Sequence, residues 1–137
     1  MLNLEVNYLG VLIAAIVNII IGFLWYGPLF GKLWIKESGI SLKKLENKKN
    51  KKVGSTYIAM FASSLIFSCV LSIILNSIEI NLIIDAILTA VLIWFGFFAA
   101  IMLGQILWER KSLKLYLINS FYYLFSLILM SIVIVLI

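Results

Sequence analysis

The chain has 137 residues, of which 64% are hydrophobic and 12% charged, about half the charged share of a typical soluble domain. A single small core cannot bury that much apolar surface, so the composition excludes an ordinary soluble domain and favours a chain surrounded by lipid. Histidine is absent and there is one cysteine, which removes the commonest general base, the commonest transition-metal ligand and any internal disulfide.

Four apolar runs are each long enough to cross a hydrocarbon core of about 30 Å. They lie near residues 6–26, 55–76, 84–107 and 115–137, and a long basic loop, 27–54, follows the first. The sequence therefore predicts one all-α domain, a polytopic membrane bundle of four transmembrane helices. Because the start of the chain lacks the basic segment and cleavage site of a signal peptide, we expect the first helix to be retained.

The loop after the first run is expected to contain a helix of its own. Gly27-Pro28 predicts the end of the first helix, because proline fits the first position of a new helix better than the interior of an old one. The segment that follows places its apolar residues on one face and Lys32 and Lys36 on another. This pattern predicts a short amphipathic helix in the cytoplasmic interface, with Gly39 as its cap.

The basic residues predict the orientation of the chain. All 11 of them lie in two loops, as lysines between 32 and 52 and as Arg110, Lys111 and Lys114. Short loops rich in Lys and Arg stay in the cytoplasm, so we expect a protein of the cell membrane with cytoplasmic basic loops and both termini outside. The solvated segment 41–52 is expected to attract anionic lipid of the inner leaflet, and basic residues so close to apolar runs argue against nucleic acid as the partner.

Small or polar residues recur at every fourth position in three of the runs, which is how helices pack closely in lipid. These are Ala14, Asn18 and Gly22 in the first run, Ser64, Ser68, Ser72 and Asn76 in the second, and Gly96, Ala100 and Gly104 in the third. Packing inside one bundle is the simpler interpretation. The alternative is a homo-oligomer in which a row, most plausibly the third, contacts a second copy.

Three amides are expected inside the membrane near the basic loops, at Asn18, Gln105 and Asn119, between about 6 and 12 Å of helix rise from the interface. An unpaired amide there costs several kcal/mol, so we expect these groups to bond one another, Glu109, Arg110 or a tyrosine hydroxyl of the fourth run. Two interpretations remain open. The amides form an interhelical clamp, or they line a small polar cavity open to the cytoplasm.

The candidate ligand- or partner-binding residues are these amides and their aromatic and charged neighbours: Asn18, Trp25, Tyr26, Gln105, Trp108, Glu109, Arg110 and Asn119. No charged residue lies deep in a run, which argues against an ion-driven pump. The sequence contains no catalytic set, metal-ligand spacing or glycine-rich phosphate loop, so we expect neither an enzyme nor a cofactor. We expect a non-catalytic, oligomeric membrane protein that binds a lipid head group or partner at its cytoplasmic edge. The alternative is a small-solute transporter or channel.

Two stretches of the sequence resemble a known family. The motif WYGPLFGK at residues 25–32, followed by Trp34, is similar to the opening segment of the domain of unknown function 1761 family. The stretch LWERKSLKLYLINSFYYL at residues 107–124 is similar to its closing segment. Members of that family are small integral membrane proteins with four predicted spans. The resemblance implies a fold of four helices and no known activity.

Overall fold

The structure, a computed structural model, describes residues 1–39 and 53–137. Its helices are α1 (Tyr8–Leu24), the π-helical segment η1 (Trp25–Leu29), α2 (Gly31–Ser38), α4 (Val53–Ser77), α5 (Ile83–Ile93), the π-helical segment η2 (Trp94–Ala99), α6 (Ala100–Glu109) and α7 (Leu113–Leu136). No strand occurs in the described ranges, and the predicted all-α fold is confirmed.

Four helical stretches are long and apolar enough to cross a membrane: Tyr8–Leu29, Gly54–Ser77, Ile83–Glu109 and Leu113–Leu136. Each lies over one of the four predicted apolar runs. The third is continuous, because η2 joins α5 to α6 without a break. The chain is thus a membrane protein built from four hydrophobic helices, with α2 as a shorter fifth element that has the expected amphipathic pattern.

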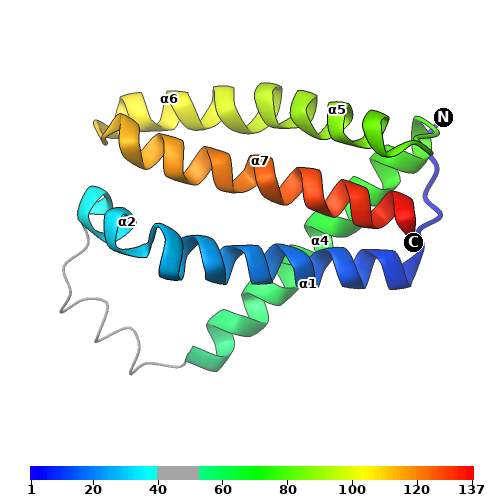
Figure 1. Cartoon of the computed structure of the whole chain (residues 1–137), viewed down its shortest axis with the longest axis horizontal. Helices are drawn as coiled ribbons and strands as arrows, with labels where there is room; N and C mark the ends of the chain where they lie inside the picture. The colour runs from blue at the N-terminus through cyan, green and yellow to red at the C-terminus, as the bar shows by residue number, and fades with distance from the viewer. Residues whose placement is uncertain (40–52) are drawn as a thin grey trace.

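The long helices are arranged around α7, which lies between α1 and the continuous α5–α6 helix, while α4 crosses the other helices obliquely (Figure 1). Both termini lie at one end of the bundle, which we call the acidic end because Glu5, Glu79 and Asp85 are there (Figure 1). The opposite end holds α2 and the turn between α6 and α7. We call it the basic end.

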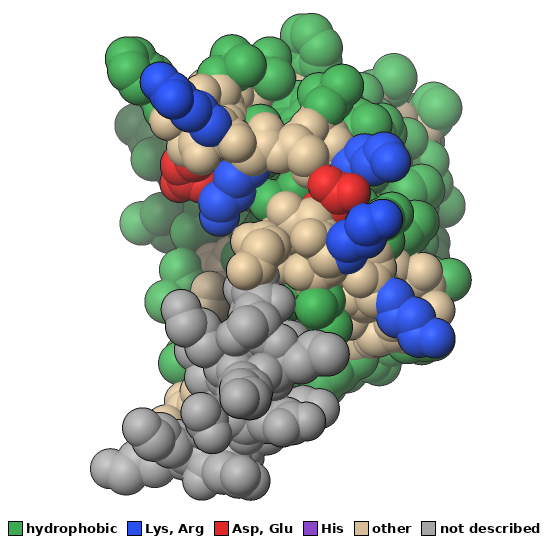
Figure 2. All heavy atoms as spheres, turned by 90° about the vertical axis from the view of Figure 1, so that its left-hand side faces the viewer, with side chains coloured by type: hydrophobic (Ala, Val, Ile, Leu, Met, Phe, Trp, Pro, Cys, Tyr) green, Lys and Arg blue, Asp and Glu red, His purple; other side chains and the backbone are tan. Residues whose placement is uncertain are grey.

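The basic end carries the described cationic side chains, which Figure 2 shows gathered on the face that also holds α2. They are Lys32 and Lys36 on α2, Arg110 and Lys111 in the turn, and Lys114 at the start of α7. The predicted solvated segment 41–52 lies outside the described residues. Within the described ranges, lysine and arginine are therefore confined to one end of the bundle, as the sequence predicts for its two basic loops.

The core lies in the half of the bundle nearer the acidic end. Its fully packed members are Leu71 and Leu75 of α4, Ala90 of α5, and Leu127 and Met130 of α7, together with Ala14 of α1. On α4 the pattern of burial changes abruptly along the helix. Residues 54–63 are all exposed, whereas Ser64, Ser68 and Leu71 are buried. The helix therefore packs closely against its neighbours along the half nearer the acidic end, while in the other half the ring of Tyr57 approaches that of Phe23 on α1.

The prediction that Gly27-Pro28 ends the first helix is wrong, because Pro28 lies inside η1. In this segment the Phe30 amide bonds the Trp25 carbonyl, an i to i−5 hydrogen bond of 2.8 Å. The wider turn tolerates the missing proline N–H and relieves the clash that a proline causes in an α-helix. The chain then turns into α2, which ends as predicted at Gly39 in the left-handed conformation, φ 74°.

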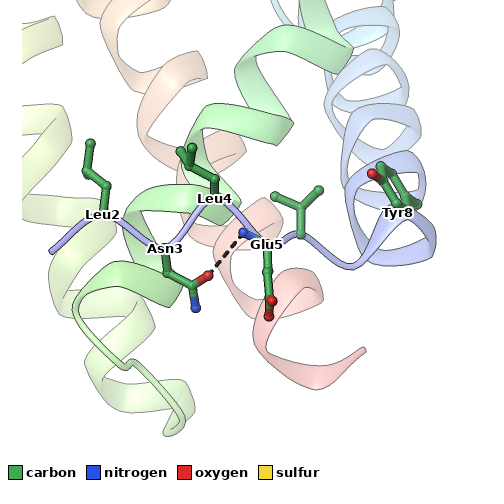
Figure 3. Close-up of a pocket in the computed structure, with 6 residues that line it drawn as sticks. Leu2, Asn3, Leu4, Glu5 and Tyr8 are labelled. Carbon is green, nitrogen blue, oxygen red and sulfur yellow. Dashed lines mark hydrogen bonds between the residues drawn. The ribbon is translucent and has the colours of Figure 1, made fainter.

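The extended N-terminal segment is fastened across the acidic end by backbone and amide hydrogen bonds. The backbone N–H of Asn3 donates to Ser77 Oγ at 2.7 Å, and the backbone carbonyl of Glu5 accepts from Asn76 Nδ2 at 2.8 Å. Figure 3 shows the Asn3 side chain accepting from the Glu5 amide, with Leu2 and Leu4 pointing to the opposite side. The hollow beside this segment is lined by residues 2–6 and by Tyr8 at the start of α1, so its described lining comes from one short stretch of the chain.

Candidate functional site

A polar cluster in the membrane-spanning part of the bundle joins three helices through Asn18 of α1. Its Nδ2 donates to Ser64 Oγ of α4 at 2.9 Å, and its Oδ1 accepts from the Tyr122 hydroxyl of α7 at 2.9 Å. The same Oδ1 also accepts a short hydrogen bond from Ser126. One amide therefore fixes the relative positions of α1, α4 and α7, and satisfies polar groups that would be costly in lipid.

A second polar layer lies nearer the basic end, between η1 and α7. The Tyr26 hydroxyl donates to Asn119 Oδ1 at 2.8 Å, and Trp25 Nε1 donates to the Ile118 carbonyl at 2.9 Å. The ring of Tyr26 meets the ring of Tyr122 edge to face, with centroids 5.2 Å apart. These contacts link the second layer to the Asn18 cluster, so the two layers form one continuous polar wall.

The predicted serine row of α4 packs against α1, as the within-bundle interpretation predicts. Ser64 Oγ donates to the Ala15 carbonyl at 2.9 Å and Ser68 Oγ donates to the Val11 carbonyl at 2.7 Å. Ser72, one turn further on, is 1% exposed. On the other side of α1, a Cβ on Gly22 would lie 3.3 Å from the Tyr122 hydroxyl oxygen, so the absence of a side chain there makes room for that tyrosine.

Beyond Ser64, α4 leaves the other helices and a cleft of about 1080 Å³ lies between them. Its walls come from α1 with η1, from the exposed half of α4, from η2 and from α7. The lining residues are Asn18, Ile19, Gly22, Phe23, Tyr26, Gly27, Thr56, Tyr57, Ala59, Met60, Ser63, Ser64, Ile66, Phe67, Phe98, Tyr122 and Tyr123. We call this the three-helix cleft, because every lining residue except Phe98 of η2 comes from α1 with η1, from α4 or from α7. Its volume is slightly above the range of about 300–1,000 Å³ that small-molecule sites occupy.

Aromatic rings form much of the cleft surface. Phe67 of α4 lies 5.9 Å from Phe98 of η2, and Phe98 lies 4.8 Å from Tyr123 of α7, measured between ring centroids. Phe23 and Tyr57 approach each other at 6.1 Å from the opposite walls. Among the described residues that line the cleft, none is Asp, Glu, Lys or Arg. The site is uncharged and mainly apolar. Its amide and hydroxyl residues are Asn18, Tyr26, Tyr122 and Tyr123 on the side of α1, η1 and α7, and Thr56, Tyr57, Ser63 and Ser64 on α4.

The sequence candidates thus divide into two groups. Asn18 and Tyr26 line the cleft, whereas Asn119 bonds the Tyr26 hydroxyl and Trp25 bonds the Ile118 carbonyl without lining the cleft. Asn18 bonds the Tyr122 hydroxyl, which is one of the expected partners. The expectation that the three amides bond one another is wrong for this structure, because Asn119 bonds Tyr26 and Gln105 is exposed without a hydrogen bond to any described residue. Hydroxyl groups on neighbouring helices are the partners of both bonded amides.

The remaining candidates, Trp108, Glu109 and Arg110, lie at the basic end outside the cleft. Trp108 is 90% exposed, and Arg110 ends α6 in the left-handed conformation at φ 55°. Glu109 lies 3.6 Å from the Lys111 ammonium, in a pair that is open to solvent on both sides. Such a pair contributes about 0–1 kcal/mol, so this turn is an exposed charged surface and has no enclosed site.

The third predicted packing row faces away from the rest of the chain. Gly96 and Ala100 are exposed, and a Cβ added to Gly96 or Gly104 would have no neighbour within 4 Å. Packing inside one bundle is therefore wrong for this row. The π-helical segment η2 contains Gly96 and contributes to the position of the row, since the extra residue per turn rotates whatever follows it around the helix.

Sequence reasoning does not single out the α4 wall of the cleft. Tyr57, Ala59, Met60 and Ser63 show no polar pattern, and only the divergence of α4 gives them a shared surface. Ser126 could have been identified from the sequence as part of the polar cluster, because it lies one helical turn after Tyr122 and shares its face. No group of three or more residues suited to hold a metal ion occurs in the part of the chain that the structure describes.

Comparison with known proteins agrees with the sequence motifs. The family model of DUF1761, described as a protein of unknown function, matches residues 9–135 and so includes the middle of the chain as well as the two motif-bearing ends. Neither a curated protein nor a solved structure matches the chain. Because the family model covers nearly the whole sequence, the resemblance carried by WYGPLFGK is confirmed. The chain belongs to the DUF1761 family of proteins of unknown function.

Proposed function

We propose that this chain is a non-catalytic membrane protein that binds a membrane lipid in the three-helix cleft. The observation that carries the proposal is the divergence of α4. Residues 54–63 are exposed along a helix of membrane-spanning length, while Asn18, Tyr26 and Tyr122 present polar groups to the same space. An uncharged site inside the membrane, with aromatic rings beside hydroxyl and amide groups, fits an amphiphile better than it fits a water-soluble molecule.

The physical support comes from what must fill such a space. A helix surface inside a bilayer is covered by acyl chains or by another helix, since both are apolar. Acyl chains alone would leave the unused hydrogen-bonding positions of the polar wall unsatisfied, at a cost in hydrocarbon. A lipid molecule can cover the α4 wall with its chain and satisfy the polar wall with its own oxygen atoms.

We place the basic end in the cytoplasm, which makes the cleft open to the inner leaflet. The separation of charge supports this orientation, because Lys32, Lys36, Arg110, Lys111 and Lys114 share one end of the bundle. Each such residue near an anionic surface contributes about 1 kcal/mol of attraction. Anionic lipid would then surround the basic end as a general electrostatic partner, without entering an enclosed site.

A second candidate function is transport of a small solute, and one observation favours it. The cleft reaches as far as Asn18 on α1 and Phe67 on α4, and the half of the bundle beyond them is packed by residues such as Leu71 and Leu75. A cavity open on one side and closed on the other is what one state of an alternating-access protein requires. This candidate predicts solute flux in proteoliposomes, whereas the lipid-binding proposal predicts none.

The proposal can be tested by filling the cleft from its exposed wall. Ala59 lines the cleft and Ala62 does not, although both are exposed on the same helix. Ala59→Trp should therefore reduce the lipid that remains bound in native mass spectrometry after mild release from the membrane, and Ala62→Trp should leave it unchanged. If Ala59→Trp retains as much lipid as the unmodified chain does, the proposal is contradicted. If both variants lose lipid to the same extent, the bound lipid lies outside the cleft and the proposal is contradicted as well.

A further inference from the structure

Resting on the proposed function, we infer that the polar part of the bound lipid is uncharged and consists of hydroxyl and ester or carbonyl groups. The three-helix cleft selects a neutral amphiphile, of which a diacylglycerol is the simplest example. The basic end of the same chain attracts anionic lipid. The two surfaces therefore recognise different lipid classes, and the cleft is a site in its own right.

The cleft has no charged lining residue, among those described, that could balance the charge of an ionised head group. Among the described residues that line it there is no Asp, Glu, Lys or Arg. Moving an ionised phosphate into a membrane cavity without a counter-charge has a large desolvation cost, several kcal/mol even after relaxation. The nearest described cations are on α2 and around the α6–α7 turn, and none of them lines the cleft. A phosphate head group is better satisfied at the basic end than in the cleft.

Several amide and hydroxyl groups of the polar wall have hydrogen-bonding positions that no described residue occupies, and these indicate which ligand groups the cleft can bind. Asn18 uses one of its two amide hydrogens on Ser64, which leaves one N–H as a donor. Tyr26 and Tyr122 donate their hydroxyl hydrogens to Asn119 and Asn18, so their oxygens can still accept. The Tyr123 hydroxyl, which also lines the cleft, makes no hydrogen bond to a described residue.

These free positions are both donors and acceptors, and all of them are neutral. A ligand hydroxyl can donate to a tyrosine oxygen, and a ligand carbonyl can accept from the free Asn18 N–H or from the Tyr123 hydroxyl. A carboxylate could only accept hydrogen bonds, so it would match only part of this set and would have no counter-charge in the cleft. Neutral oxygen groups are the chemistry that uses the whole wall.

The aromatic residues of the cleft provide a binding surface for the apolar part of the same lipid molecule. Met60 and Phe67 of α4 face the space, and the rings of Phe98 and Tyr123 close it at the back. Methionine and aromatic side chains adapt well to flexible hydrocarbon chains. Polar and apolar side chains line the same cleft, so one amphiphile can contact both.

The test uses two photoactivatable lipids with identical acyl chains, a diacylglycerol and a phosphatidylglycerol, each in proteoliposomes of neutral lipid containing the full chain. After irradiation, mass spectrometry maps the labelled residues. The inference predicts that the diacylglycerol labels the cleft, at residues such as Phe23 and Met60, at least fivefold more than the phosphatidylglycerol does. Ala59→Trp should abolish this labelling, and Ala62→Trp should preserve it.

A milder variant tests the hydrogen-bonding part separately. Tyr26→Phe keeps the ring and removes the hydroxyl, so cleft labelling by the diacylglycerol should fall roughly fivefold, equivalent to about 1 kcal/mol. Unchanged labelling would overturn the assignment of the polar wall. If both lipids label the cleft equally, the neutral class is wrong while lipid binding stands. If neither lipid labels it, the proposed function itself fails.

Discussion

Trp25 and Trp94 donate their indole hydrogens to backbone carbonyls two residues apart on α7. Trp25 bonds the Ile118 carbonyl at 2.9 Å, and Trp94 bonds the Ser120 carbonyl at 2.6 Å. Each tryptophan is the first residue of a π-helical segment, η1 in one helix and η2 in the other. The two helices that flank α7 are thus fastened to the same turn of it by the same kind of contact, at the places where their own hydrogen-bond pattern changes.

Removing one of these indole donors should destabilise the protein measurably. We expect Trp25→Phe and Trp94→Phe each to lower the free energy of unfolding in detergent by about 0.5–1.5 kcal/mol, because a ring is kept and a hydrogen bond is lost. Trp108→Phe is the matched control, since Trp108 is 90% exposed and its indole bonds no described residue. A loss as large for the control would show that the tryptophan contacts with α7 have no special role.

The Asn18 cluster predicts a difference between two amides that look alike in the sequence. Asn18→Leu removes the partner of Ser64, Tyr122 and Ser126 at once, so we expect a loss of about 1–3 kcal/mol in unfolding free energy. Gln105→Leu should be neutral or slightly stabilising, because Gln105 is exposed and bonds no described residue. If both variants lose the same unfolding free energy in chemical denaturation, Gln105 makes an interaction as stabilising as those of Asn18, and the prediction is wrong.

The turn into α2 predicts opposite effects for two glycines four residues apart. A Cβ on Gly31 would lie 2.6 Å from the Tyr26 carbonyl oxygen, so Gly31→Ala should shift α2 and lower stability by about 1–3 kcal/mol. A Cβ on Gly27 would meet nothing within 4 Å, and Gly27→Ala should be neutral or stabilising by about 0.5–1 kcal/mol. Thermal unfolding of the two variants is the measurement, and a loss on Gly27→Ala alone would contradict it.

The proposed orientation is tested by labelling single cysteines from outside intact cells. In a Cys69→Ala background, a cysteine in place of Glu5 at the acidic end should react with a membrane-impermeant maleimide. A cysteine in place of Lys36 on α2 should react only after the membrane is permeabilised, because the positive-inside rule places its end in the cytoplasm. The reverse labelling pattern would invert the proposed orientation and place the cleft in the outer leaflet.

We propose that the outward-facing row of Gly96, Ala100 and Gly104 contacts a second copy of the chain. Because a side chain at Gly96 would meet nothing within the chain, Gly96→Leu should leave the fold as stable as before while weakening any homo-oligomer. Phe97→Trp adds bulk beside the row on a residue that is 68% exposed, and serves as the control. Crosslinking in native membranes that is the same for both variants and the unmodified chain would exclude this row as the interface.

The amino-acid sequence predicted the α2 helix and its Gly39 cap correctly, but it predicted the wrong end for the first helix. The rule against proline inside a helix holds for the i to i−4 hydrogen bond, and η1 avoids the rule by bonding Phe30 to Trp25 instead. Nothing local in Trp25–Leu29 distinguishes a helix break from a π-helical turn. The contacts of Trp25 and Tyr26 with α7, which are distant in the sequence, favour the second.

The small-residue rows also show that a local sequence pattern identifies a feature without determining its contacts. Spacing by four identified the Ser64 and Gly96 rows equally well, yet the first is buried against α1 and the second faces outward. The spacing places residues on one face of a helix and carries no information about what that face meets. In lipid both outcomes are acceptable for an apolar surface, so the choice depends on the neighbouring helices.

The sequence by itself determined the four apolar helices, the family, and the collection of the described basic residues at one end, because hydropathy and charge act locally and add along the chain. Only the tertiary structure decided that Asn18 bonds Ser64 and Tyr122, and that α4 separates from its neighbours beyond Ser64. Both depend on how side-chain volumes and hydrogen bonds from three helices fit together. The three-helix cleft exists because that fit ends halfway along α4.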